Sequence, residues 1–325
     1  MRLGIMSFAH MHAYSYASVI KQLPGVELVG VADENPDRGK QAAESFDTRF
    51  FPSFEELLKA DIDGVVITSA NRDHRALTEM AAGAGKHVLC EKPIATTLED
   101  AYAMEKVVKE TGIKFQMAFP CRFIPSVQRL KALYDEGRLG RILAIRGTNR
   151  GKMPGGFFID PEAAGGGAII DHTVHLADLV RWIFNTEFKE VYCEMDRHFH
   201  DIPTEDCGLL TLELTNGAFM TIDPSWSRPN TFYTWGDLYL EVVGTDMVAE
   251  ADLMRQSLDR ITLDQPNYQW DFWGANMDYY LVKEFVDSFR EDREPSITAL
   301  DGVRALEVAV GAYESAKSGQ PVKLR

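Results

Sequence analysis

Residues 84–93 are Ala-Gly-Lys-His-Val-Leu-Cys-Glu-Lys-Pro, and this stretch decides the fold. Its apolar part, His87 to Cys90, has the length and composition of a buried strand. Two charged residues follow, at the carboxyl end of a strand, where open parallel sheets bind their ligands. Because Pro93 disfavours a helical conformation for Lys92, we predict an extended lysine beside the sheet that can exchange a proton. The alternative is a salt-bridged surface lysine, which is the usual state of lysines.

Apolar runs on both sides of this strand alternate with helical patterns up to about residue 120. Such alternation is the signature of a parallel sheet wound by crossover helices, of which Asp100 to Glu110 is one. We therefore predict a Rossmann-type doubly wound domain over residues 1–121. Its other strands are expected at Leu3 to Met6, Val26 to Ala32, Gly64 to Thr68 and Lys114 to Ala118.

The pattern changes after Arg122, where a helical stretch, a strand around Ile142 to Arg146 and a glycine-rich segment follow one another. From Glu187 onward it is meander-like, with Asn216-Gly217 as a hairpin turn. We predict an α+β domain over residues 122–325 with a large, mostly antiparallel open sheet. Its further strands are expected at Val191 to Arg197, Cys207 to Leu214, Ala218 to Pro224, Leu238 to Val243 and Ile261 to Leu263, and its last helices at Asn276 to Arg290 and Ala299 to Ser318.

The composition, with 45% hydrophobic and 26% charged residues over 325 positions, is typical of a globular protein of two domains. The apolar runs are too short to span a membrane, and the N-terminus lacks a signal-peptide pattern. The net charge of -15 repels phosphate backbones, which excludes nucleic acid as an expected partner. Any anionic ligand must then be held by local positive charge or by a helix N-terminus.

The four cysteines are widely spaced, with no Cys-x-x-Cys pair. Neither a disulfide framework nor a structural zinc site is predicted, and a reducing cytoplasm is the simplest setting. They are Cys90, Cys121, Cys193 and Cys207.

A strand, a tight turn and a helix from Leu3 to Ile20 match the start of a dinucleotide-binding unit. Where G-x-G-x-x-G is expected, however, the chain has Ser7-Phe8-Ala9-His10-Met11-His12. Small residues stand at the first two glycine positions only, so an ordinary βα turn is the alternative. We predict that all six residues contact the cofactor. The two histidines, without other ligands at a recognisable spacing, do not predict a metal.

Asp33 ends the second strand, where a carboxylate can accept hydrogen bonds from the adenosine ribose and repel a 2′-phosphate. This favours NAD over NADP. A helix cap before Pro36 is the competing interpretation, and the nearby Arg38 leaves NADP possible.

The fourth strand ends at the same edge of the sheet as Glu91 and Lys92. We predict that the cofactor contacts polar and small residues from both strand ends. They are Thr68, Ser69, Ala70, Asn71, His74, Glu91 and Lys92.

In the second domain, Gly165-Gly166-Gly167 precedes a helical pattern that contains Asp171 and His175. Residues four apart share one helix face, so these two side chains should lie together. The glycines are expected to bring the backbone close to the cofactor. A hydrogen-bonded pair on a solvated face is the alternative.

Together these motifs resemble the Gfo/Idh/MocA family of oxidoreductases over essentially the whole chain. Residues 84–93 are similar to the family's A-G-K-H-V-x-x-E-K-P, and Asn71 with His74 match its upstream N-x-x-H. Residues 165–175 match G-G-G-x-x-x-D-x-x-x-H, and residues 314–322 resemble the family's C-terminal ending.

The resemblance implies a catalytic trio of Lys92, Asp171 and His175 around the nicotinamide. It also implies a cis bond before Pro93, a place for Arg122 beside the substrate cleft, and homodimers or homotetramers formed through the second sheet.

The chain departs from the family pattern at three places. The phosphate turn is poor in glycine, Ala70 stands where proline is frequent, and Phe157-Phe158 stands where many members have Trp-Arg. Cofactor geometry and substrate contacts are the properties that these departures affect.

We predict reversible oxidation of a secondary alcohol on a sugar, an inositol-like polyol or a sugar derivative. His175 would take the hydroxyl proton, with Asp171 holding its pKa up, while Lys92 would stabilise the developing alkoxide. Asp171 would orient His175 or the substrate. The substrate-site walls are expected among Trp226, Arg228, Tyr233, Trp235 and Asp237.

Two alternatives stay open. One is a non-enzymatic NAD(P)-bound sensor or regulatory subunit, because a fold can outlast its chemistry. The other is an NAD-assisted glycosidase or dehalogenating enzyme of the same fold, which never releases reduced cofactor.

Overall fold

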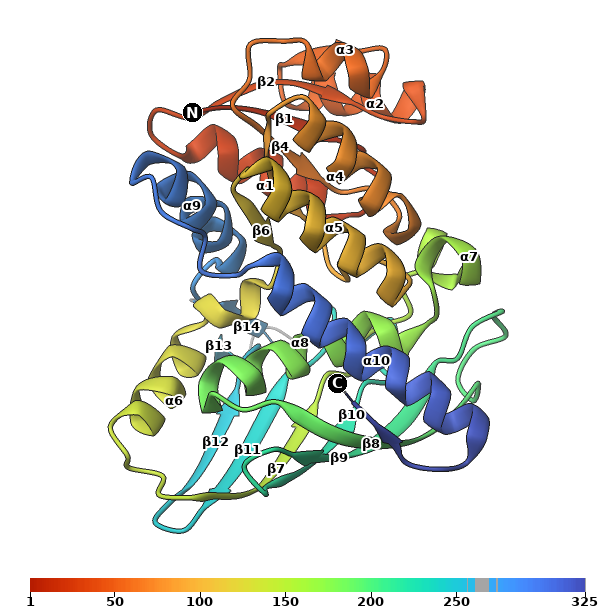
Figure 1. The fold of residues 1–325 in the computed structure, drawn as a ribbon, viewed down its shortest axis with the longest axis vertical. Helices are drawn as coiled ribbons and strands as arrows, with labels where there is room; N and C mark the ends of the chain where they lie inside the picture. Colours follow the sequence, from red (N-terminus) through yellow and green to blue (C-terminus); the bar gives the residue numbers. More distant parts are fainter. Residues whose placement is uncertain (256, 261–268, 273, 325) are drawn as a thin grey trace.

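The structure, a computed structural model, describes residues 1–255, 257–260, 269–272 and 274–324. The first half of the chain forms one end of the molecule and the second sheet forms the other, with α10 (Ala299–Ser318) running between them (Figure 1).

The first sheet is fully parallel, in the order β3-β2-β1-β4-β5-β6. Helices cover both of its faces (Figure 1), which is why its central strands β4 and β5 are buried and almost wholly apolar. The chain order reverses between β1 and β4, and ligands bind at such a switch point. The strands are β1 (Arg2–Met6), β2 (Glu27–Ala32), β3 (Arg49–Phe51), β4 (Gly64–Ile67), β5 (His87–Cys90) and β6 (Phe115–Met117).

The crossover helices begin and end at residues suited to those positions. Asn35 and Thr97 accept hydrogen bonds from the first turns of α2 and α5, and Gly112 ends α5 with a φ of 67°. The helices of this half are α1 (His12–Gln22), α2 (Pro36–Ser45), α3 (Phe54–Leu58), α4 (His74–Gly83) and α5 (Leu98–Thr111), with a 3-10 turn, η1 (Asn71–Asp73).

The second sheet has the order β12-β11-β7-β10-β9-β8-β15. All its pairs are antiparallel except β7 with β10. The strands are β7 (Ile142–Thr148), β8 (Phe188–Asp196), β9 (Cys207–Leu214), β10 (Phe219–Asp223), β11 (Tyr239–Gly244), β12 (Val248–Asp252) and β15 (Val322–Lys323), and β13 (Ser257–Arg260) pairs separately with β14 (Gln269–Phe272).

Helix α8 (Ala168–Phe184) is buried over almost its whole surface, since α10 packs against it. The other helical elements of this half are η2 (Pro120–Phe123), α6 (Pro125–Asp135), η3 (Gly156–Ile159), α7 (Pro161–Ala164) and α9 (Met277–Arg290).

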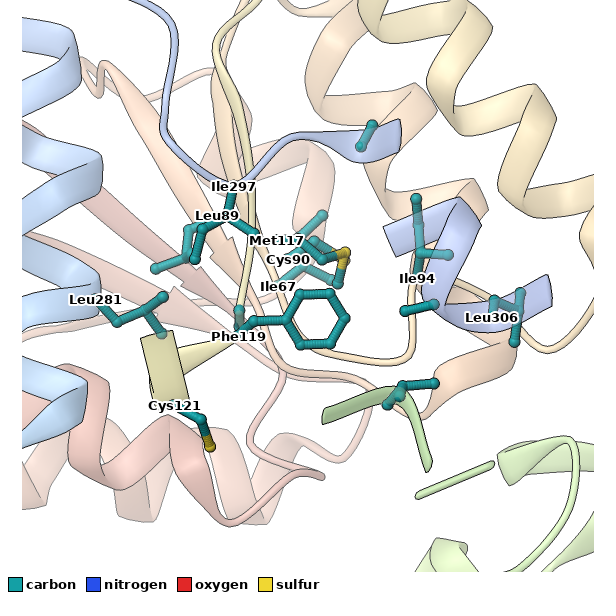
Figure 2. Packing of buried hydrophobic residues seen from close by; sticks show 14 of the residues in the cluster. Ile67, Leu89, Cys90, Ile94, Met117, Phe119, Cys121, Leu281, Ile297 and Leu306 are labelled. Atoms are coloured by element: carbon teal, nitrogen blue, oxygen red, sulfur yellow. The ribbon is translucent and has the colours of Figure 1, made fainter. Parts of the chain in front are cut away.

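The two halves share a continuous core. Figure 2 shows Ile297 and Leu306 of the C-terminal segment beside residues of the first half. A Cβ at Gly302 would lie 2.8 Å from the sulfur of Met117, so α10 needs a glycine to approach β6 this closely. The amide of Met117 also donates to the Ile297 carbonyl at 3.0 Å.

These observations confirm the predicted fold class. The short strands β3, β12 and β15 and the parallel β7–β10 pair were not predicted. The strand predicted at Ile261 to Leu263 lies outside the described residues. In the described part of the chain, no helix combines the length and apolar character needed to span a bilayer.

Candidate active site

A cavity of about 450 Å³ lies at the carboxyl end of the parallel sheet, between the two halves of the chain. An open cavity of about 540 Å³ lies elsewhere, over β8 and β9, and contains none of the predicted catalytic residues. The first cavity is lined by His10, Met11, His12, Lys92, Pro120, Cys121, Lys152, Pro154, Phe158, Asp171, His172, His175, Trp235, Leu238, Met277 and Asp278.

Lys92 projects into this cavity directly after β5. Its peptide bond to Pro93 is cis, as the resemblance implies. The Nζ atom lies 2.5 Å from Oδ1 of Asp171 and 3.3 Å from the Asp171 carbonyl oxygen. Both side chains are nearly inaccessible to solvent, and the surface-lysine alternative is therefore wrong.

The second carboxylate oxygen of Asp171 is also occupied. Nε1 of the fully buried Trp226 donates to Oδ2 at 3.1 Å, and Nε2 of His172 lies 3.3 Å from the same oxygen. Burial alone would raise the pKa of Asp171, but Lys92 and His172 outweigh it and the pKa is lowered. The carboxylate is thus held ionised in one orientation.

His175 lies one helical turn beyond Asp171 and lines the same cavity. Its Nδ1 is 4.0 Å from Sγ of Cys121, which leaves Nε2 as the ring nitrogen available to a ligand. Burial lowers the pKa of His175 well below its usual value, and the positive charge of Lys92 adds to this. Asp171 does raise this pKa, as predicted, but desolvation and the charge of Lys92 exceed its attraction, so the net shift is downward.

Packing alone requires the three glycines before α8, and their predicted close approach to the cofactor stays a prediction. A Cβ at Gly165 would lie 2.7 Å from Cβ of Thr96, and one at Gly166 would overlap the hydroxyl of Tyr313. The Glu205 carboxylate accepts hydrogen bonds from the amides of Gly167 and Ile169 at 2.9 and 3.0 Å, and it therefore caps α8.

The turn after β1 has the backbone conformation of a glycine turn. Ser7 has a φ of 77°, in the left-handed region, at the first glycine position of the usual motif. Its hydroxyl donates to Glu34 at 3.0 Å and accepts from the amide of Ala9 at 3.1 Å. Thr68 donates to the Ser7 carbonyl at 2.6 Å, which ties β4 to this turn.

Asp33 is already engaged on both oxygens. It accepts from the amides of Phe8 and Asn35, each at 2.7 Å, and it pairs with Arg38 at 2.8 Å. Asn35, not Asp33, caps α2. The helix-cap interpretation is therefore wrong, and a ribose would find the Asp33 carboxylate partly neutralised by Arg38.

His10, His12 and Glu91 form a cluster whose potential ligand atoms lie within 4.8 Å of one another, so proximity alone would allow a metal ion. The hydrogen bonds oppose one. Nδ1 of His10 accepts from the amide of His12 at 3.1 Å, so the proton of a neutral ring is on Nε2, where a metal needs a lone pair. Burial lowers the pKa of His10 to about 3.

Glu91 has two closer partners. Its Oε1 accepts from Nδ1 of His12 at 2.8 Å and from the Tyr16 hydroxyl at 2.5 Å. The pKa of His12 is raised because Glu91 outweighs burial, whereas the pKa of Glu91 is lowered. We infer an imidazolium–carboxylate pair beside the cavity.

Several residues predicted to bind the cofactor also hold loops in place. The buried Asn71 donates to the Ala164 carbonyl at 2.9 Å, and Nδ1 of the buried His74 lies 2.9 Å from the Pro93 carbonyl oxygen. Ser69 and Ala70 are buried between β4 and η1. His74 is thus placed to support the loop that carries Lys92, whereas Asn71 holds the end of α7, next to the glycines before α8.

Arg122 does not line the cavity. Its guanidinium pairs with Asp178 at 2.5 Å and with Asp301 at 3.2 Å, and it donates to the Ser296 carbonyl at 3.0 Å. The guanidinium is therefore held outside the cavity, whereas the neighbouring Pro120 and Cys121 line it, and a place for Arg122 beside the substrate stays a prediction.

Of the five predicted substrate-wall residues, only Trp235 lines the cavity. Trp226 acts through Asp171, Arg228 pairs with Asp237, and Tyr233 is 40% exposed. Sequence reasoning missed Lys152, His172 and Asp278. His172 adjoins Asp171 in the helical pattern and could have been found, but the other two carried no motif.

A lysine, a carboxylate and a histidine meet where the carboxyl edge of a Rossmann sheet faces a second open sheet. This arrangement defines a two-domain, dinucleotide-binding class of protein. Residues 2–119 match the oxidoreductase family with an NAD-binding Rossmann fold, and residues 127–250 match the GFO/IDH/MocA C-terminal domain. The chain belongs to the Gfo/Idh/MocA family of oxidoreductases.

Two relatives and one solved structure illustrate its similarities. Glucose-6-phosphate 3-dehydrogenase of Bacillus subtilis is 31% identical, covering 99% of this chain and 98% of that one. The scyllo-inositol 2-dehydrogenase (NAD(+)) of the same organism is 27% identical, covering 99% and 96%. The crystal structure of GenD2 from gentamicin A biosynthesis, in complex with NAD, shares the fold with a TM-score of 0.91, at 24% identity and coverages of 100% and 96%.

Proposed function

We propose that the protein is an NAD-dependent dehydrogenase that interconverts a secondary alcohol and a ketone on a sugar, an inositol-like polyol or a sugar derivative. The observation that carries this proposal is the meeting of Lys92, Asp171 and His175 in one cavity at the carboxyl edge of the parallel sheet.

In this proposal Nε2 of His175 accepts the hydroxyl proton of the alcohol. A general base must be unprotonated at the working pH. The lowered pKa of His175 keeps its imidazole neutral throughout the neutral range. The driving force for proton transfer is smaller than for an unperturbed histidine, so a second group has to stabilise the developing alkoxide.

Lys92 is that group. Its ammonium donates a hydrogen bond to the reacting oxygen while Asp171 holds it through one carboxylate oxygen. Because Trp226 fixes the other oxygen of Asp171, the lysine is oriented before the substrate arrives. Such preorganised donors cost no rearrangement during the reaction.

NAD, when bound, supplies the hydride acceptor. The left-handed turn at Ser7 and the small side chain of Ala9 fit a pyrophosphate beside the N-terminus of α1. The adenosine ribose would lie against Asp33 and Arg38. Since Arg38 offsets the carboxylate charge, the preference for NAD over NADP is expected to be moderate.

The relatives support the substrate class, because one is named for a sugar phosphate and the other for an inositol. We further propose that residues 1–121 bind the cofactor, that residues 122–325 bind substrate, and that the second sheet forms a homodimer or homotetramer in the cytoplasm.

The test is a screen of sugars, inositols, their acids and phosphates, and their keto forms with NAD and NADP, read by reduced-nicotinamide absorbance. Turnover that accumulates reduced cofactor supports a dehydrogenase. Conversion of substrate without net cofactor reduction would indicate the transient-oxidation alternative, and binding without any turnover would indicate a sensor.

A further inference from the structure

Lys152 is a cavity-lining cation without a partner among the described residues. It lies in the segment that follows β7, where its backbone amide donates to the Trp235 carbonyl at 2.8 Å. The side chain is half-buried, and its ammonium makes no hydrogen bond or ion pair with any side chain or carbonyl in the described ranges.

The other cations of the cavity are neutralised where they stand. Lys92 pairs with Asp171 at 2.5 Å, and His12 pairs with Glu91 at 2.8 Å. A lysine that is partly desolvated and uncompensated is unfavourable in the empty protein, and it gains most from a ligand with the opposite charge. Among these three, Lys152 is the one whose charge is not already offset by a carboxylate, so it is the one left for an acidic group of a ligand.

Lys152 is close to the proposed reaction centre. The preceding residue, Gly151, runs so close to His172 that a Cβ there would lie 2.7 Å from its ring, and His172 touches the Asp171 carboxylate. Trp235 and Phe158 line the same cavity. Apolar walls exclude water and strengthen the attraction between a cation and an anionic ligand.

A carboxylate on another wall of the cavity determines how an acidic ligand is oriented. Asp278, in the first turn of α9, accepts from the Ser15 hydroxyl at 2.5 Å through one oxygen, and its other oxygen has no partner in the described chain. An acidic ligand group is repelled from Asp278 and attracted to Lys152. The acidic group therefore points toward Lys152.

We propose that the substrate carries an acidic group, a carboxylate or a phosphate, which Lys152 binds. The substrate class is then a sugar acid or a phosphorylated sugar or polyol. This inference rests on the proposed function. With a net charge of -15, an anionic substrate gains from a local cation such as Lys152.

The experiment compares neutral aldoses, alditols and inositols with their aldonates, uronates and monophosphates. Two quantities are measured for each: kcat/KM with NAD, and the rise in melting temperature on binding. The acidic members should bind and react better than their neutral parents, and their advantage should shrink as salt is added. Comparison of carboxylates with phosphates identifies the acidic group.

Three variants test the assignment to Lys152. Lys152→Gln should lower kcat/KM for the acidic substrate about 10- to 100-fold more than for its neutral parent, as expected for a lost hydrogen bond to a charged group. Lys152→Arg should retain most of the preference. Lys40→Gln, the same change on exposed α2, should have no effect.

The outcomes separate the two proposals. If acidic compounds raise the melting temperature no more than their neutral parents, or if Lys152→Gln leaves the preference intact, the inference is wrong while the dehydrogenase stands. If no compound reduces NAD, the proposed function fails, and the melting temperatures still decide whether an anion binds at Lys152.

Discussion

At the scale of single residues, Lys92 and Asp171 depend on each other, because both are buried charges that form an ion pair. We predict that Lys92→Ala lowers kcat about 10²- to 10⁴-fold, the range for a general acid–base or oxyanion group. The affinity for NAD should change little, since the lysine acts at the reacting oxygen. Steady-state kinetics and cofactor titration measure both, and an unchanged kcat would give Lys92 a structural role.

The pH dependence of the reaction follows from the burial of His175. Because its pKa is lowered well below the ordinary value of about 6.5, the acidic limb of kcat/KM should lie below that pH. Asp171→Asn removes an attraction that favours the imidazolium, so the limb should move lower still, and His175→Ala should abolish it. A limb at or above pH 6.5 in the unaltered protein would contradict this assignment.

The same shift has a consequence for stability. As the pH falls below about 6.5, an unfolded chain protonates His175 before the folded protein does, and this favours unfolding. The buried, neutral His175 therefore stabilises the folded protein above about pH 6.5, and this stabilisation is lost as the pH falls. A histidine held in an ion pair behaves in the opposite way, because its stabilisation is lost as the pH rises.

Substitutions of Ser7 test whether the left-handed backbone conformation of the turn after β1 is strained. Its φ of 77° costs a residue with a Cβ about 1–2 kcal/mol, whereas its hydroxyl recovers part of that through Glu34 and Ala9. Ser7→Gly and Ser7→Ala both lose the hydroxyl, but only glycine relieves the conformation. Chemical denaturation should show Ser7→Gly to be more stable than Ser7→Ala by about 1 kcal/mol. Equal stabilities would mean that the turn relaxes.

At the scale of elements, α8 positions the proposed catalytic residues, and Glu205 holds its first turn. Glu205→Ala should cost about 0.5–2 kcal/mol as a lost cap and lower kcat more than NAD affinity. Ser53→Ala is the matched control, because it removes the cap of α3, which contributes nothing to the cavity. If both variants lose stability and neither loses kcat, the cap does not position the site.

Sequence patterns predicted the elements whose signal is local. Helix α10 was predicted at its observed bounds because Thr298 and Gly319 mark both ends and its buried face has helical spacing. Strand β3, with only Arg49 to Phe51, and β15, with two residues, are too short for any periodicity. Their pairing is decided by neighbouring strands.

The properties of the candidate site also divide into those that a local sequence motif predicts and those that depend on the folded structure. Lys92, Asp171 and His175 lie in motifs, so their meeting could be predicted, although their pKa values could not. Those depend on burial, which the sequence does not give. The packing role of the glycines before α8 could not be predicted, because Tyr313 and Glu205, which need the space, are 146 and 38 residues away from Gly167.

At the scale of the whole molecule, Arg122 joins three elements, since η2 carries it while Asp178 lies on α8 and Asp301 on α10. Removing one partner of a buried pair leaves an uncompensated charge, so Arg122→Met should cost about 3–5 kcal/mol.

The double variant Arg122→Met/Asp178→Asn should recover part of that loss, because Arg181 still neutralises Asp301 at 3.1 Å. Denaturant unfolding gives the stabilities, and the folded variants should keep the KM of the unaltered protein, because the guanidinium lies outside the cavity. A rise in KM of tenfold or more with unchanged stability would return Arg122 to the substrate cleft. In that case the ion pairs of Arg122 would stabilise the contact between the two halves less than the apolar packing of α10 against Met117 and Ile94 does.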